Sequence, residues 1–287
     1  MRTIAYNQVV QSVETLCIDC AFQLPPDVAQ ALRQAAGRET NPRAREILEQ
    51  LIENARIAAE ERIPLCQDTG LAVVFVQQGA DVQIVPPDDK PAATIVDAIC
   101  QGVAAGYEKG FLRKSVVAEP LNRRQNTQTN TPPVIHYSVV PGQTVHISLM
   151  AKGGGCENKS CLRMFNPTDS KEAVIDWIVQ AVKQAGASAC PPFVVGVGLG
   201  GNFELSCLLA KKSLLRKIGE ANPDPFYAQM EQDLLAAVNA SGLGPMGLGG
   251  DTTALAVCIE TAPCHIASLP AAVNIECHSH RHKSITI

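Results

Sequence analysis

The sequence predicts a mixed α/β protein, and three observations lead to this fold class. Residues 9–59 carry apolar side chains at helical spacing. Two later stretches, 71–76 and 193–197, are short continuous apolar runs of the kind that form buried strands. No internal repeat or low-complexity linker divides the chain. We therefore expect one domain over residues 1–287, with a helical part at 1–62 and a mixed α/β core at 63–287.

The helical part is expected to contain three helices. In the first, apolar residues recur at Val9, Val13 and Leu16. Proline and aspartate at residues 25–27 mark the start of the second helix. Asn41–Pro42 marks the start of the third, with Asn41 as its N-cap.

The core is expected to alternate strands with helices. Helices are predicted over residues 91–107, 170–185, 204–215 and 225–238. Strands at 134–140 and 144–151 read as a hairpin about Pro141–Gly142, and two final strands are predicted near 254–260 and 265–275. The polar stretch 113–133 is a long loop, and loops of this length inside compact domains are usually functional.

Composition excludes several classes of function. Charged residues make up only 18% of the 287 residues and the formal net charge is −4, which argues against a nucleic-acid partner. The chain has no apolar run long enough to span a membrane and no apolar N-terminal stretch typical of a signal peptide, so we expect a cytoplasmic protein without a membrane partner.

The eleven cysteines should then be mostly reduced thiols. Cys17 and Cys20 form a C-x-x-C pair on a predicted helix and are expected in the core. Cys66, Cys190 and Cys277 differ, because each sits in a polar or proline-set context that a core cysteine does not need.

Three thiolates at separated positions can hold a cuboidal iron–sulfur cluster that keeps one iron open to substrate as a Lewis acid. At Cys66 a second interpretation stays open. The following Asp68 and Thr69 can simply satisfy backbone donors of a turn, with the cysteine buried.

The segment 151–160 joins three consecutive glycines to two lysines. Such glycines allow backbone N–H groups to converge on an anion, for example a carboxylate, and Lys152 and Lys159 can add positive charge. Cys156, directly after the glycines, is a possible fourth thiolate ligand.

Two other patterns point to different classes of protein. Gly196–Gly201 has the G-x-G-x-x-G form of a dinucleotide-binding turn and would suit an NAD-binding oxidoreductase. However, Arg216 and Lys217 stand where an acidic ribose ligand is expected. Residues 277–282, with Cys264 and His265, supply enough cysteine and histidine for structural zinc, although the spacing matches no common zinc finger.

Several segments, taken in order, resemble the class I iron–sulfur fumarase family, and specifically its separate α subunit. L-tartrate dehydratase α subunits share the same skeleton, and the ENKS that follows the glycines is more similar to the fumarases. The segments that carry the resemblance are CQDTG at 66–70, NTQTNTPP at 126–133, KGGGCENKS at 152–160, SACPP at 188–192, GPMGLGGDTT at 244–253 and the run from His265 to Cys277.

The resemblance implies a [4Fe–4S] cluster with one substrate-accessible iron, held by Cys66, Cys190 and Cys277. It implies a hydro-lyase that reversibly hydrates fumarate to L-malate in the tricarboxylic acid cycle. Asp68 would be the catalytic residue that manages the hydroxyl proton. Three residues would bind substrate: Gln67, Arg113 and Gly155.

Relatives that are single chains continue into a second domain that supplies the general base. The resemblance therefore implies a β subunit that completes the active site, in a heterodimer or heterotetramer. The closest alternative functions are the α subunits of an L-tartrate dehydratase or of a mesaconase-like enzyme, which acts on a methylated fumarate. Many relatives carry serine where this chain has Cys156.

Overall fold

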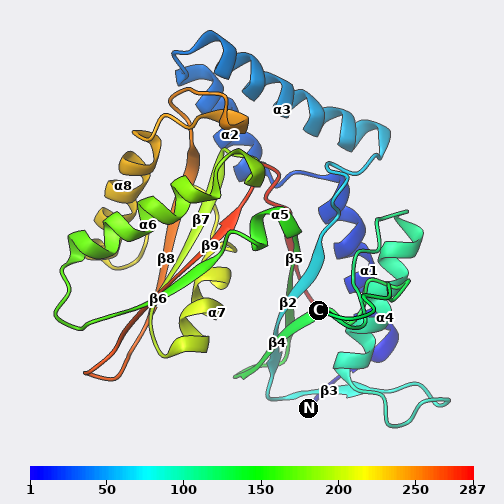
Figure 1. Cartoon of the computed structure of the whole chain (residues 1–287). Helices are drawn as coiled ribbons and strands as arrows, with labels where there is room; N and C mark the ends of the chain where they lie inside the picture. Colours follow the sequence, from blue (N-terminus) through cyan, green and yellow to red (C-terminus); the bar gives the residue numbers. More distant parts are fainter. The chain divides into compact units, whose positions relative to one another are not determined.

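A computed structural model describes all residues from Met1 to Ile287, and the chain folds into two compact units (Figure 1). The first unit comprises Met1–Pro25, Ile57–Gly153 and Arg281–Ile287, and the second comprises Pro26–Arg56 and Gly154–His280. Both units combine helices with mixed sheets, which confirms the predicted α/β class. The prediction that the whole chain acts as one domain stays a prediction.

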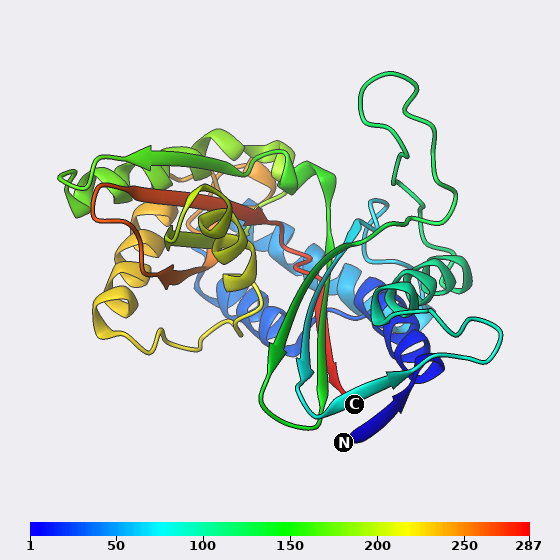
Figure 2. The ribbon, with the colours of Figure 1, turned by 90° about the horizontal axis from the view of Figure 1, so that it is seen from below.

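The first unit contains a four-stranded sheet with two long helices on one face. Figure 2 shows α1 and α4 side by side against this sheet. The strand order is β10-β5-β2-β4, in which only the β2–β4 pair is parallel, and β1 and β3 form a separate parallel pair. The elements are β1 (Arg2–Ala5), α1 (Tyr6–Phe22), β2 (Leu71–Gly79), β3 (Val82–Val85), α4 (Ile95–Lys109), β4 (Val134–Val140), β5 (Val145–Lys152) and β10 (His282–Thr286).

Helices α1 and α4 pack closely because α4 carries glycine at the contact. A Cβ on Gly102 would lie 2.7 Å from the Cβ of Val13, and one on Gly106 would lie 2.7 Å from the Cβ of Cys17. The buried face of α1 has the predicted helical spacing and includes both Cys17 and Cys20, which confirms that these cysteines belong to the core.

The predicted hairpin of β4 and β5 is wrong, because β2 lies between them. Strand β2 is the most apolar of the three and is paired on both edges, whereas β4 leaves Val139 62% exposed and takes an edge. The Pro141–Gly142 turn instead closes on the turn after β2, where Asp81 N–H donates to Gly142 O over 3.1 Å. A parallel β2–β4 pair requires a long crossover connection, which α4 and the loop after it provide.

The second unit contains another four-stranded sheet, in the order β6-β9-β7-β8. Phe193, Val195 and Val197 of the central strand face the core beneath α6 and α8. The opposite face of that strand carries α7. The elements are α2 (Pro26–Arg38), α5 (Gly154–Glu157), β6 (Cys161–Phe165), α6 (Lys171–Ala185), β7 (Phe193–Gly200), α7 (Phe203–Ser213), α8 (Pro225–Asn239), β8 (Ala254–Ala262) and β9 (Leu269–Glu276), together with α3 (Pro42–Glu61), which begins in this unit and ends in the first.

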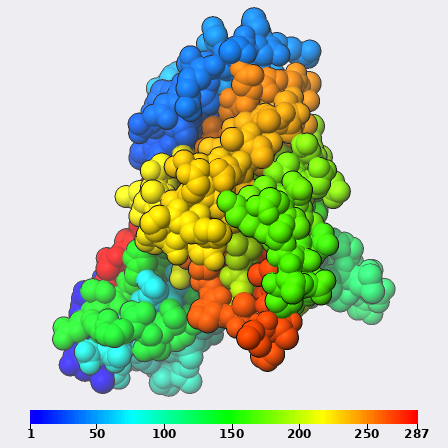
Figure 3. All heavy atoms as spheres, turned by 90° about the vertical axis from the view of Figure 1, so that its left-hand side faces the viewer, coloured from blue at the N-terminus to red at the C-terminus, as the bar shows by residue number.

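Helix α2 lies against the segment that follows α7 in this unit, as the blue and yellow surfaces of Figure 3 show. Ile218 N–H donates to the carboxylate of Asp27 in the first turn of α2, over 2.8 Å. The last two predicted strands exist, but β7 separates them, and β9 begins at Leu269 because residues 263–268 form a turn. No helix has the length and apolar character needed to cross a bilayer.

Candidate metal centre and substrate site

Cys190 ends a short 3-10 turn at Ala187–Ala189 in the second unit. Its backbone is left-handed, with φ 57° and ψ 66°, and its N–H donates to Ala187 O over 2.9 Å. Its carbonyl accepts from His278 N–H over 3.3 Å. This contact places the Cys190 turn directly beside the residue that follows Cys277.

Cys277 follows the last residue of β9 and is buried. The structure brings Cys277, Glu276 and Cys156 together, with one sulfur or carboxylate oxygen of each within 4.8 Å of the others. The Cys156 thiol also donates to Ala189 O over 3.3 Å. The second unit therefore groups Cys277 with the possible fourth thiol, Cys156, and the Cys190 turn contacts this group through backbone carbonyls.

Gly155 lies in the short helix α5, next to the same turn. A Cβ built on Gly155 would lie 3.4 Å from Ser188 O. The Glu157 carboxylate fixes this helix by accepting from Lys211 Nζ and, over 3.1 Å, from Asn274 Nδ2. The predicted carboxylate-binding glycine and the predicted ligand Cys190 thus belong to one local arrangement.

Cys66, Gln67 and Asp68 belong to the first unit, just before β2. Cys66 is partly buried, and Gln67 is exposed. Asp68 Oδ1 accepts from Gly70 N–H over 3.0 Å, so the capped turn expected as the alternative is present. A turn that caps its own backbone still leaves Cys66 partly accessible, so the turn and a ligand role are compatible.

Arg281 lies beside Asp68, and Lys152 is a second buried basic residue of this unit. Arg281 Nη1 donates to Asp68 O over 2.6 Å, and both basic side chains are 1% exposed. Sheet register explains the meeting, because β10 pairs with β5 beyond Arg281, and Lys152 of β5 pairs with Leu71 of β2. The Asp68 turn of the first unit therefore lies beside the buried guanidinium group of Arg281.

The long loop holds Arg113 next to this turn. Thr69 Oγ1 donates to Arg113 O over 3.0 Å. Asn130 Oδ1 accepts from Ser115 and Val116 N–H over 2.7 and 3.2 Å, while its Nδ2 donates to Gly70 O over 3.1 Å. The Arg113 side chain itself is exposed.

The profile of the fumarate hydratase (Fumerase) family matches residues 10–286. The chain belongs to this family. A Methanocaldococcus jannaschii protein, provisionally named L(+)-tartrate dehydratase subunit alpha, is 40% identical over 267 residues, covering 92% of this chain and 92% of that protein. Escherichia coli K12 L(+)-tartrate dehydratase subunit alpha is 27% identical over 285 residues, covering 99% of this chain and 92% of that protein.

Arg281 was missed from the sequence of this fumarase-family chain. It stands within the histidine-rich run 277–282, which suggested zinc rather than anion binding. The metal-competent group Cys156, Glu276 and Cys277 contains no histidine. His265 lies in an exposed turn, where its Nδ1 accepts from Ala267 N–H over 3.1 Å.

The G-x-G-x-x-G pattern has a packing explanation in this family member. Gly196 and Gly198 lie inside β7 rather than in a loop after it. A Cβ on Gly196 would lie 2.1 Å from Ala210 O, and one on Gly198 would lie 2.0 Å from Ser206 O, both in α7. Glycine is required here because the helix backbone touches the strand, and no phosphate is needed to account for the pattern.

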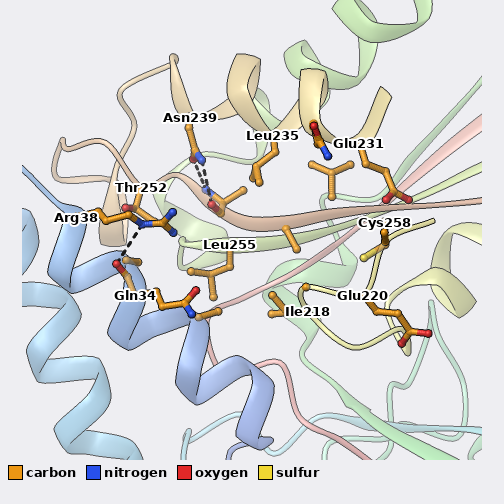
Figure 4. Close-up of a pocket in the computed structure, with 18 of the residues that line it drawn as sticks. Gln34, Arg38, Ile218, Glu220, Glu231, Leu235, Asn239, Thr252, Leu255 and Cys258 are labelled. Carbon is orange, nitrogen blue, oxygen red and sulfur yellow. Dashed lines mark hydrogen bonds between the residues drawn. The ribbon is translucent and has the colours of Figure 1, made fainter. Parts of the chain in front are cut away.

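The second unit also contains a cavity of about 500 Å³ between α2, α8 and the edge strand β8. In Figure 4, Leu255 and Ile218 face the cavity, and Gln34 and Glu220 lie around it. Its lining includes none of the predicted cluster or substrate residues. We therefore assign it no part in the chemistry.

Proposed function

We propose that the chain is the α subunit of a [4Fe–4S]-dependent hydro-lyase, with Cys66, Cys190 and Cys277 as cluster ligands. The hydrogen bond from His278 N–H to Cys190 O carries the proposal, because it joins two of the predicted ligand turns in a fumarase-family chain. Thiolates are the donors that iron–sulfur clusters use, so the residues present fit this group. The third ligand, Cys66, would come from the first unit.

The proposed reaction is reversible hydration of fumarate to L-malate, as the ENKS segment favours. L(+)-tartrate is a second candidate substrate, because the similar relatives carry that name. Both are four-carbon dicarboxylates, and both reactions make or break a C–O bond next to a carbon that exchanges a proton. Residues of this chain therefore need to bind two carboxylates and move one hydroxyl proton.

Each site residue then has a defined task. The bound cluster would supply Lewis acidity toward the hydroxyl of the substrate. Asp68 takes or gives the hydroxyl proton, and Arg281 holds the Asp68 backbone in place by donating to its carbonyl. Gln67 contacts substrate next to Asp68. Arg113 supplies positive charge for one substrate carboxylate.

Gly155 would donate its backbone N–H to a substrate carboxylate. A β subunit would supply the base that removes the proton from carbon. The names of the relatives support such a partner, because both contain the words "subunit alpha". Fixing both carboxylates orients the reacting carbons and lowers the entropic part of the barrier.

Anaerobic reconstitution tests the proposal. We expect about four iron and four sulfide per chain, the composition of a cubane cluster. With a β subunit co-expressed, initial rates on fumarate, L-malate and L(+)-tartrate would identify the substrate. Zinc in place of iron, or no metal uptake, would contradict the cofactor assignment.

Three variants separate the roles of individual residues. Cys190→Ser should lose the cluster, whereas Cys156→Ser should keep it. The opposite iron contents would show that the ligand set is wrong. Asp68→Asn should keep the cluster and lose most turnover, at least about 100-fold if it acts as an acid or base. Unchanged turnover would exclude the role given to Asp68.

A further inference from the structure

A completely buried carboxylate lies outside the predicted site, at the C-terminal end of α2. Glu39 has 0% exposure. Its Oε1 accepts from Asp251 N–H over 2.8 Å and from Asn41 N–H over 3.2 Å. Its Oε2 accepts from Thr252 N–H over 3.1 Å. A buried charge requires such donors, and Glu39 finds them in backbone amides rather than in a basic side chain.

Two of those amides belong to the glycine-rich loop 244–253, so Glu39 anchors one end of this loop. The attachment is reciprocal, because Thr40 N–H donates to Asp251 Oδ2 over 3.0 Å. Gly250, at φ +125°, has no room for a side chain, since a Cβ there would lie 3.0 Å from Glu39 Oε1. The loop is thus built around the carboxylate.

The other end of the loop contacts the turn that carries Cys190. Met246 N–H donates to Pro191 O over 2.8 Å, and a Cβ on Gly247 would lie 2.4 Å from the Cβ of Ala187. The loop also closes on itself, because Gly249 N–H donates to Leu243 O over 2.9 Å. The loop therefore joins Glu39 to the residues on both sides of Cys190.

We infer that Glu39 is a positioning residue for Cys190. Through the 244–253 loop, its carboxylate holds the 187–191 turn in the left-handed conformation that sets the direction of the Cys190 side chain. The inference rests on the proposed function in one respect, that Cys190 is a cluster ligand. Glu39 itself touches neither substrate nor cluster.

Glu39→Gln tests this with almost no change in shape. Both carboxylate oxygens accept backbone N–H groups, so an amide nitrogen at either position would face a donor. Glu231→Gln is the control for loss of a buried carboxylate elsewhere in the unit, although Glu231 is also ion-paired with Arg216. Glu231 is also a buried carboxylate in this unit and also accepts a backbone N–H, that of Ile259 over 2.7 Å, but it lies on α8 outside the 244–253 loop.

Two readouts are measured on the full-length chain. In the cluster-free protein, alkylation of Cys190 is followed by peptide mass spectrometry and normalised to the exposed Cys264. In the reconstituted protein, iron release to a chelator is timed. We expect Glu39→Gln to accelerate both by about tenfold, the factor that follows from losing a hydrogen bond to a charged acceptor. Glu231→Gln should leave both within about twofold of wild type.

Equal acceleration in both variants would show a general loss of stability and overturn the inference, as would unchanged rates in Glu39→Gln. If the wild-type chain takes up no iron, the proposed function fails, but the alkylation comparison still decides the role of Glu39. If Glu39→Gln does not fold, Asp251→Asn replaces it. That exposed side chain holds the same loop through Thr40, so alkylation should rise, and an unchanged rate would refute the coupling.

Discussion

Replacing Asn130 by alanine should release the loop that carries Arg113 from the Cys66–Gly70 turn. Asn130 has 0% exposure, and its side chain makes three hydrogen bonds, to Ser115, Val116 and Gly70. Each bond is worth about 1 kcal/mol net. The two amides left behind are not deeply buried and can bind water, so the full desolvation cost does not apply.

Backbone conformation adds to the loss. Asn130 has φ +58°, which asparagine tolerates and alanine disfavours by about 1 kcal/mol. The expected destabilisation of Asn130→Ala is therefore about 3–4 kcal/mol. With a urea m-value of about 3 kcal/mol/M, the unfolding midpoint should fall by roughly 1 M. KM of the reconstituted complex should rise, because Arg113 loses its fixed position.

Two companion variants separate the contributions. Asn130→Asp keeps both acceptor bonds but turns a carboxylate oxygen toward the Gly70 carbonyl in a buried position, so it should lose more than the one donor bond. Asn130→Gly also removes the hydrogen bonds, but glycine adopts a positive φ without strain. This variant should therefore be less destabilised than Asn130→Ala. A urea unfolding midpoint for Asn130→Ala within about 0.2 M of wild type would show that Asn130 does not hold the loop to the turn.

Two further predictions concern the two cores. Gly198→Ala should lower the free energy of unfolding by about 3 kcal/mol or more, since its Cβ would lie 2.0 Å from Ser206 O. Gly37 lies on the exposed side of α2, and a Cβ there would have nothing within 4 Å. Gly37→Ala should therefore raise the free energy of unfolding by about 0.5–1 kcal/mol. Similar unfolding midpoints for the two variants would contradict the packing explanation. Burial raises the pKa of Cys20 from 9.0 to about 12. The folded state then favours the thiol, so this stabilisation is complete below pH 9 and is lost as pH rises toward 12. Relative to Cys20→Ala, the wild-type chain should lose about 2 kcal/mol of unfolding free energy between pH 9 and 10.5, as measured by urea unfolding. If the two proteins have parallel profiles of stability against pH, Cys20 does not titrate this way.

Local patterns in the sequence predicted most helices, because the spacing of apolar residues along a helix indicates which of its faces is buried. The spacing of Val9, Val13 and Leu16 is visible without knowing what the helix packs against. Strand pairing depends instead on partners far along the chain. The Pro141–Gly142 turn looked like a hairpin, yet the more apolar β2 needed two partners and took the place between β4 and β5.

The same contrast between local patterns and long-range contacts applies to the site. Each predicted ligand was recognisable from its own segment, but its neighbours were not. Arg281 reaches Asp68 only because β10 pairs with β5 and β5 pairs with β2. Cys156 of α5 meets the adjacent residues Glu276 and Cys277 from far along the chain, and neither segment alone indicates this contact. For Arg281 and Asp68 the contact depends on sheet register, which the sequence does not display.

Glycine density shows why a motif needs its surroundings before it can be assigned a function. At Gly196 and Gly198 an added Cβ would collide with helix backbone near 2 Å, so packing alone demands glycine. At Gly155 the nearest atom would be 3.4 Å away, and its φ lies outside the left-handed region. Neither space nor backbone conformation within the chain requires glycine there. A requirement for glycine at this position would have to come from a molecule that approaches its backbone, which is the role that a substrate carboxylate would have.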